Sequence, residues 1–279
     1  MVFYLSDHLS QYYLMTGVPD LVHPAGMVIL FFAIVLSFLL KKAFCSWFCP
    51  VGTVSEWLWK LGHRLFGKNV LPPKWIDIPL RSLKYLLMYF FVMSVVKMDQ
   101  GQMASFLGGH YWKIADVKML IFFMNMSRFT MIVLIVITIA SLFIRNFWCR
   151  YLCPYGGFLA IFSFMSPSRV TRNEKICTDC GICAKACPAY LPVDKKPYIL
   201  SAECTGCIMC TEACPVKEAL QFETLPLKPS FWNSKRLTLV ILGGFLILVI
   251  VAKASGIWDS NTPTKEIFEL LPFLNRISH

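Results

Sequence analysis

Two cysteine runs with the same spacing stand close together in the C-terminal half of the chain. Each follows the pattern C-x2-C-x2-C-x3-C-P; the first spans Cys177 to Pro188 and the second Cys204 to Pro215. Three closely spaced thiolates let one short loop wrap three corners of a cube, with backbone N–H groups facing the sulfides. A proline after the fourth cysteine ends the following turn without leaving an N–H to be paired. The spacing therefore predicts two iron–sulfur sites in one short segment.

The doubled run resembles that of bacterial ferredoxins with two [4Fe–4S] clusters, in which the fourth cysteine of each run serves the other cluster. The resemblance implies two crossed ligand sets. The Cys177 set is Cys177, Cys180, Cys183 and Cys214, and the Cys204 set is Cys204, Cys207, Cys210 and Cys187. Zinc is the simpler alternative, but zinc sites usually pair two C-x2-C hooks without extending them to a third and fourth cysteine.

The composition indicates a membrane protein. The chain of 279 residues is 57% hydrophobic and 15% charged, with a mean hydropathy of +0.59. Soluble domains carry about 25% charged residues. The net charge of +11 does not indicate nucleic acid, because Lys and Arg stand mainly beside apolar runs, where they set membrane orientation. Twelve cysteines, eight of them in the two sets, favour a reducing compartment.

Four apolar runs predict transmembrane helices, at 25–40, 85–96, 129–144 and 237–252. The second run spans only if the stem of Lys84 is counted, with its ammonium snorkelling outward. We therefore expect an α-helical integral membrane protein of about four transmembrane helices with an inserted bacterial-type 2[4Fe–4S] ferredoxin α+β domain. The predicted domains are a membrane domain at 1–166, a ferredoxin domain at 167–228, and a last helix with an outer tail at 229–279.

Positive charge predicts the orientation. Residues 1–23, an expected interfacial segment, carry no Lys or Arg, whereas 41–84 carry eight and 99–128 carry three. The side richer in Lys and Arg is the cytoplasmic one. The N-terminus and the C-terminus are therefore expected outside, and the ferredoxin domain in the cytoplasm of a bacterium or archaeon, on its inner membrane. Residues 1–23 also lack a continuous apolar core, so no cleavable signal peptide is expected.

A second pair of motifs forms an internal repeat. Cys45 and Cys49, and again Cys149 and Cys153, form C-x3-C-P at the end of an apolar run, and a glycine follows two residues after each proline. Cysteines four apart lie on one face of a helix, so two such faces could supply four thiolates to a third metal centre. Flanking Lys and Arg are expected to lower the pKa values of these thiols.

Other interpretations of these four cysteines remain open. Cysteine is a small apolar residue that helix ends tolerate, although this explains four cysteines in a matched repeat poorly. Soft thiolates suit another [4Fe–4S] cluster or a different soft metal such as Cu(I). A redox-active dithiol is a further alternative.

The duplicated C-x3-C-P followed by the double ferredoxin run resembles the NapH/NosR/CcoG family of membrane-bound polyferredoxins, over about residues 25–225. The resemblance implies electron transfer at the cytoplasmic membrane. In NapH-like members this means quinol oxidation that feeds a periplasmic reductase. In NosR-like members it means flavin-linked electron delivery, and in CcoG-like members copper-site assembly.

We therefore expect an iron–sulfur protein that passes electrons between the quinone pool or a cytosolic donor and a respiratory redox partner, as a subunit of a quinol dehydrogenase-like oxidoreductase. The expected cofactors are two [4Fe–4S] clusters, with a third centre and a quinone as further candidates. The expected partners are the lipid bilayer and other redox subunits, and no nucleic acid. The alternative is a metallocentre assembly or copper-reducing factor.

Overall fold

The computed structural model describes residues 24–67, 72–99, 101–102, 115–225, 232–256 and 258. The predicted interfacial segment 1–23 lies outside the described residues, as does most of the expected outer tail. The chain divides into two compact units. The larger comprises residues 30–88 and 134–248, and contains every cysteine. In the smaller, the described residues form α8 (Ala115–Met124), a short helical turn at 101–102 and end segments of the long helices. The predicted domain limits at 166 and 228 stay predictions.

Four long apolar helices correspond to the four predicted runs: α2 (Pro24–Leu40), α5 (Lys74–Val96), α9 (Arg128–Phe143) and α13 (Ser234–Ala254). Among the described residues, two helices are long and apolar enough to cross a membrane, Trp75–Val96 and Ser234–Ala254. The count rises to three if Val117–Met124 and Arg128–Phe143, which meet at a bend of 83°, form one span. The chain has the helices of a membrane protein, but the predicted count of four spans is not confirmed.

The internal repeat extends to the backbone. The first copy continues from α2 through α3 (Ala43–Trp47) to α4 (Pro50–Phe66). The second continues from α9 through a π-helical turn, η1 (Trp148–Leu152), to α10 (Pro154–Phe164). Proline is favoured at the first position of a helix because its missing N–H needs no partner there.

The second cysteine of each copy is the N-cap of the helix that the proline opens. Cys49 has φ −69° and ψ 117°, and Cys153 has nearly the same values, φ −72° and ψ 106°. The expectation that each cysteine pair lies on one face of a continuous helix is therefore wrong. The chain turns at the second cysteine, because an extended residue must precede the proline, and this turn sets the direction of the second thiol.

The ferredoxin segment, by which we mean residues 168–225, contains a small antiparallel sheet with strand order β2-β1-β3. Its strands are β1 (Ser168–Arg172), β2 (Tyr198–Ile199) and β3 (Leu220–Thr224). Val170 in β1 stands opposite Ile199 in β2 and Phe222 in β3. These three side chains are buried on one face, as the two-residue period of a strand requires. The helices α11 (Ile182–Ala186) and α12 (Met209–Glu212) each contain one cysteine of the doubled run, Cys183 and Cys210.

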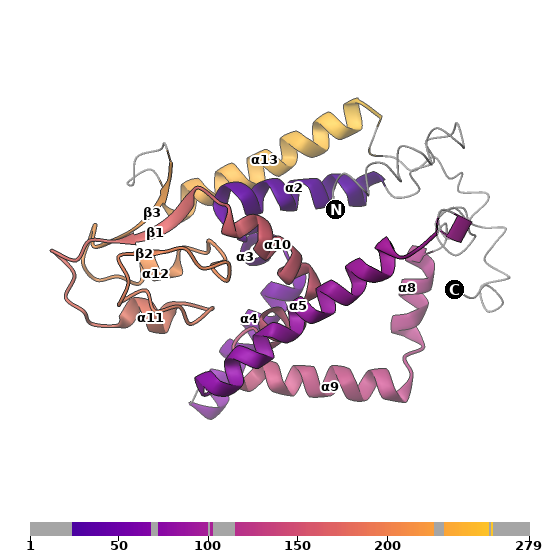
Figure 1. Cartoon of the computed structure of the whole chain (residues 1–279), viewed down its shortest axis with the longest axis horizontal. Helices are drawn as coiled ribbons and strands as arrows, with labels where there is room; N and C mark the ends of the chain where they lie inside the picture. The colour runs from indigo at the N-terminus through magenta and orange to yellow at the C-terminus, as the bar shows by residue number, and fades with distance from the viewer. Residues whose placement is uncertain are drawn as a thin grey trace. The chain divides into compact units, whose positions relative to one another are not determined.

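This segment shares one core with the ends of the apolar helices α2 and α13. A single cluster of buried residues joins Leu36 and Leu40 of α2, Val170 and Phe222 of the sheet, and Leu237 of α13. The Ser168 hydroxyl at the start of β1 also donates to the Leu39 carbonyl at 2.5 Å. Figure 1 shows the strands, α11 and α12 gathered beside α3 and the C-terminal end of α2. Apolar packing therefore fixes the ferredoxin segment on these helix ends.

Candidate iron–sulfur sites

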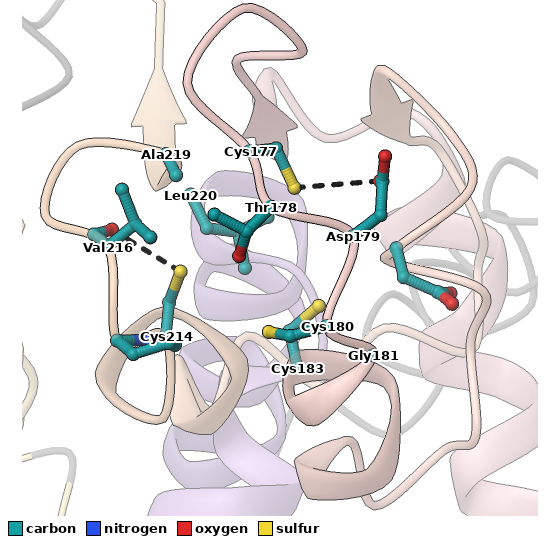
Figure 2. Close-up of a pocket in the computed structure, with 12 residues that line it drawn as sticks. Cys177, Thr178, Asp179, Cys180, Gly181, Cys183, Cys214, Val216, Ala219 and Leu220 are labelled. Carbon is teal, nitrogen blue, oxygen red and sulfur yellow. Dashed lines mark hydrogen bonds between the residues drawn. The ribbon is translucent and has the colours of Figure 1, made fainter.

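The Cys177 set lines one cavity. Figure 2 shows that the loop from Cys177 to Cys183 lies on one side of the cavity and Cys214, from the second run, on another. Cys180 is exposed, Cys177 and Cys214 are half-buried, and Cys183 is buried. The other lining residues also come from the ferredoxin segment, between Thr178 and Leu220. The structure thus brings together the four cysteines that sequence spacing grouped, at a site with one thiol open to the surface.

The Cys204 set lines a second cavity. Cys187, Cys204 and Cys210 are buried, and Cys207 is half-buried. Burial raises the pKa of Cys204 to about 11. Burial also raises the pKa of Cys210 well above its usual value, and the neighbouring thiols of Cys207, Cys204 and Cys187 raise it further. The four predicted cysteines are again neighbours, but in a more enclosed environment.

The two loops follow the same unusual backbone path. Asp179 and Gly206 hold equivalent places in the two runs, and both have positive φ, 53° and 60°. The next pair, Gly181 and Ile208, also has positive φ, 70° and 53°. Non-glycine residues rarely adopt such values. The matching pairs therefore show that the spacing imposes one loop shape twice.

The cysteines of the C-x3-C-P repeat line a third cavity; we call Cys45, Cys49, Cys149 and Cys153 the repeat set. The cavity is also lined by Lys42, Arg81, Arg150 and Glu203. One thiol has a local donor, because the Gly156 N–H donates to Cys153 Sγ at 3.3 Å. Four cysteines that lie in two distant parts of the sequence thus meet at one site.

Two thiols of the repeat set, Cys45 and Cys149, are not activated by their basic neighbours. Burial raises the pKa of Cys45 to about 12, and Lys42 offsets this only in part. Burial likewise raises the pKa of Cys149 to about 12, with Cys153, Cys45 and Cys49 adding to the shift. The expectation of lowered pKa values is wrong for these two thiols, because desolvation outweighs the nearby cations. A reactive dithiol needs a thiolate, whereas a metal can bind such a thiol by displacing its proton.

Two basic residues that flank the repeat set, Arg145 and Arg150, are paired with carboxylates. Arg145 is 2% exposed and donates to both carboxylate oxygens of Glu56, at 3.1 Å and 2.7 Å. Arg150 is 7% exposed and donates to both oxygens of Asp77, each at 3.0 Å. Bidentate pairs of this kind fix the geometry of the arginine. These two arginines therefore stabilise the packing of the repeat.

Both copies of the repeat contact the Cys204 set. From the first copy, Ser46 Oγ donates to the Thr205 carbonyl at 2.9 Å, and a Cβ on Gly206 would lie 2.3 Å from the Leu40 carbonyl oxygen. From the second copy, Arg145 donates to the carbonyl of Ala186, the residue before Cys187, at 3.1 Å. Pro188, Ala189 and Thr205 line the repeat-set cavity themselves. The Cys204 set therefore adjoins the repeat set.

Sequence reasoning missed Glu203, which precedes Cys204. Its carboxylate accepts from Lys42 and Lys84, and from the Tyr85 hydroxyl. Burial disfavours the charged form, but Lys42 and Lys84 outweigh it and lower the pKa of Glu203 to about 2. The predicted outward snorkelling of Lys84 is wrong, because its side chain is fully buried against this carboxylate. The one local signal in the sequence was an acidic residue beside a predicted ligand.

The donor sets fit the chemistry of iron–sulfur clusters. A [4Fe–4S] cluster is held by four cysteine thiolates, and each of the three cavities is lined by four cysteines. All twelve cysteines are free thiols. Among the described residues, no group of three or more His, Cys, Asp and Glu side chains is arranged to hold a single metal ion.

Comparison with known families assigns the class of protein. A family described as a 4Fe-4S binding domain matches residues 22–69 and 128–171, and a 4Fe-4S dicluster domain matches residues 169–215. The first family thus covers both C-x3-C-P motifs, and the second covers the doubled run. The chain is an iron–sulfur protein of the ferredoxin type, and the two predicted [4Fe–4S] clusters are confirmed at the level of these domains.

Individual relatives identify the family. YccM of Escherichia coli (strain K12), a protein named for electron transport, is 44% identical over 276 residues, which cover 96% of this chain and 76% of YccM. An uncharacterised protein of Methanocaldococcus jannaschii is 29% identical over 170 residues, 58% of this chain and 65% of that protein. The regulatory protein NosR of Pseudomonas aeruginosa is 25% identical over 155 residues, 53% of this chain and 20% of NosR.

The chain belongs to the NapH/NosR-like family of membrane polyferredoxins, as its cysteine motifs predicted. Its general role is iron–sulfur electron transfer. The chain spans about three quarters of YccM but less than two thirds of the other two relatives. No solved structure matches the chain.

Proposed function

We propose that each four-cysteine set holds one [4Fe–4S] cluster, with the crossed ligands of the Cys177 and Cys204 sets and a third cluster on the repeat set. Two findings support the third centre. The four cysteines of the repeat set share one cavity, and the 4Fe-4S binding domain family covers both of their motifs. When bound, each cluster accepts and returns single electrons. The chain holds the clusters, and it buries three of the four cysteines of the Cys204 set, whereas the cysteines of the repeat set are half-buried.

We propose that electrons pass between the repeat set and the Cys177 set through the Cys204 set. One observation carries this order: residues adjoining Cys187 and Cys204 also line the repeat-set cavity. The cavity of the Cys177 set, by contrast, is lined only by residues of the ferredoxin segment, and one of its cysteines, Cys180, is exposed. An exposed centre suits exchange with another redox protein, whereas an enclosed one suits exchange within the chain.

We propose that the repeat set exchanges electrons with the quinone pool, and the Cys177 set with a redox partner of a respiratory chain. The position of the repeat set supports this, because its motifs directly follow the apolar helices α2 and α9. The excess of Lys and Arg in residues 41–84 supports a cytoplasmic ferredoxin domain at the inner membrane. In this arrangement the protein acts as a quinol dehydrogenase-like subunit embedded in the lipid bilayer.

Quinol-driven reduction tests this function. The protein is purified anaerobically, reconstituted with iron and sulfide, placed in lipid nanodiscs and mixed with menaquinol, while cluster absorbance and EPR signals are recorded. We expect the clusters to be reduced, and a variant with all four repeat-set cysteines changed to Ser to lose this reaction while dithionite still reduces its ferredoxin clusters. Reduction of that variant by quinol at the wild-type rate would contradict the proposed entry point. Reduction by dithionite alone in the wild-type protein would contradict the link to quinone.

A further inference from the structure

Glu203 joins the ferredoxin segment to the membrane helices by polar contacts. Its Oε2 accepts from Lys84 Nζ at 2.5 Å and from Lys42 Nζ at 3.3 Å, and its Oε1 accepts from the Tyr85 hydroxyl at 2.7 Å. Lys84 and Tyr85 belong to α5, and Lys42 follows α2. The exposed fractions are 17% for the Glu203 side chain, 5% for Lys42 and 0% for Lys84. Charge-assisted hydrogen bonds of low exposure hold a geometry more firmly than surface pairs do.

The position of Glu203 relates it to two cysteine sets. It directly precedes Cys204, and its own N–H donates to Ser201 Oγ at 3.2 Å, which fixes the backbone entering that ligand. Its side chain also lines the repeat-set cavity. Among the described residues that line this cavity, Glu203 is the one carboxylate, beside the cations of Lys42, Arg81 and Arg150. Glu203 lines neither of the two ferredoxin cavities, and its link to the Cys204 set is the peptide bond to Cys204.

A fixed charge changes how readily a neighbouring centre takes up an electron. A negative charge disfavours the added electron and lowers the reduction potential, and the effect is strongest where water is excluded. Lys42 and Lys84 reduce the effect of Glu203 while both are paired with it. Removing only the carboxylate would leave the two cations without this partner. The local charge would become more positive, and the reduction potential of a neighbouring centre should rise.

We propose that Glu203 is a positioning residue for electron transfer, which holds the Cys204 loop against the repeat set and lowers the reduction potentials of the two centres that it separates. The potential of the Cys177 centre is independent of it. This inference rests on the proposed clusters. The role of Glu203 at the Cys204 centre requires only the two ferredoxin clusters. In this arrangement Glu203, which is not a ligand, sets the difference in reduction potential between the Cys177 centre and the two inner centres, those of the Cys204 set and the repeat set.

Redox titrations monitored by EPR test the inference on the full-length reconstituted protein. In E203Q, the reduction equilibrium constants of the Cys204 and repeat-set centres should rise at least tenfold, which is about 59 mV for one electron. The Cys177 centre should not shift. In E203D, which keeps the charge on a shorter side chain, the potentials of both inner centres should stay close to the wild-type values. The matched control is Glu218→Gln, an exposed carboxylate in the segment that borders the Cys177 cavity. It should leave both inner centres unchanged.

A double variant separates charge from folding. E203Q/K84M removes one negative and one positive charge, so the inner potentials should return towards the wild-type values. Iron content measured on the same samples shows whether each variant still holds its clusters. An E203Q protein with full iron and unshifted potentials would overturn the inference, as would an equal shift of all three centres. If E203Q loses iron, the inference stands only if the double variant regains both iron and wild-type potentials. Absence of a repeat-set signal in the wild-type protein would contradict the third cluster, and the shift of the Cys204 centre would still test the role of Glu203.

Discussion

The two halves of the doubled cysteine run have the same spacing but different surroundings. Around the Cys177 set, the residue with positive φ between the first two cysteines is Asp179, whose side chain is 69% exposed. Around the Cys204 set, the equivalent residue is Gly206, which packs directly on the Leu40 carbonyl of α2. The loop of the Cys177 set is exposed at Asp179, whereas the loop of the Cys204 set is docked on the C-terminal end of the apolar helix α2.

The difference shows how a symmetric motif can give a directional protein. The spacing of the cysteines produces two equivalent loops, and a few residues that are not ligands determine which loop is docked. Gly206 permits close approach, Glu203 supplies a buried ion pair, and Arg145 reaches the backbone next to Cys187. In the proposed arrangement, a cluster in the docked loop would lie between the repeat set and the exposed Cys177 set.

The largest expected effect comes from breaking the crossed ligand sets. Cys214→Ser should remove the cluster of the Cys177 set, although Cys214 belongs to the second run, because its thiol lines that cavity. About four irons per chain should be lost. Cys187→Ser is the matched variant and should remove the cluster of the Cys204 set, which we call the docked cluster. EPR spectra of the two reduced variants identify the cluster that each one keeps. Loss of the docked cluster in Cys214→Ser would show that the ligands are not crossed.

The next largest effect is expected when Gly206 of the docked Cys204 loop is replaced by aspartate, the residue at the equivalent position, Asp179, of the exposed Cys177 loop. Gly206→Asp places a side chain against a backbone carbonyl that cannot move aside. Overpacking costs about 1–3 kcal/mol and a left-handed non-glycine residue about 1–2 kcal/mol. A total of about 3 kcal/mol should lower the Tm by about 6–12 °C, measured by circular dichroism in detergent. The reverse change, Asp179→Gly, should move the Tm by only a few degrees, and equal effects would remove the distinction between the loops.

A smaller effect is expected from the second anchor of the docked loop. Glu56→Gln keeps the shape of the side chain but weakens the bidentate pair with Arg145, and should cost about 1–2 kcal/mol because hydrogen bonds to charged groups are involved. Asp179→Asn weakens the pair of Arg172 with an exposed partner and should cost less than about 1 kcal/mol. Thermal unfolding of both variants measures the difference. A larger loss in Asp179→Asn would contradict the assignment of the docked side.

The sequence contained most of the information on which cysteines meet. Short spacings determine how a loop wraps, so the neighbours in each ferredoxin set could be predicted from the motif. The repeat set could be predicted from the matched residues around Cys45 and Cys149, because copies of one motif fold alike. The ligand assignments themselves remain a proposal until metal binding is measured.

The environment of these cysteines could not be predicted from local patterns. Glu203 and Lys84 lie 119 residues apart, and their pairing depends on how the ferredoxin segment docks. Lys84 was expected to reach water because its sequence neighbours are apolar. The pKa values of Cys45 and Cys149 were expected to fall because cations are close in sequence. Burial reversed both expectations, since it depends on the assembled fold.

The most direct test of the account is the iron content of the anaerobically reconstituted protein. Three clusters predict about twelve iron atoms and twelve acid-labile sulfides per chain, four for each cluster. The variant with Ser at Cys45, Cys49, Cys149 and Cys153 should hold about eight of each and keep both ferredoxin EPR signals. A wild-type protein with only eight irons, whose four repeat-set thiols react freely with an alkylating reagent, would contradict the third centre and with it the proposed path from the membrane to the exposed cluster.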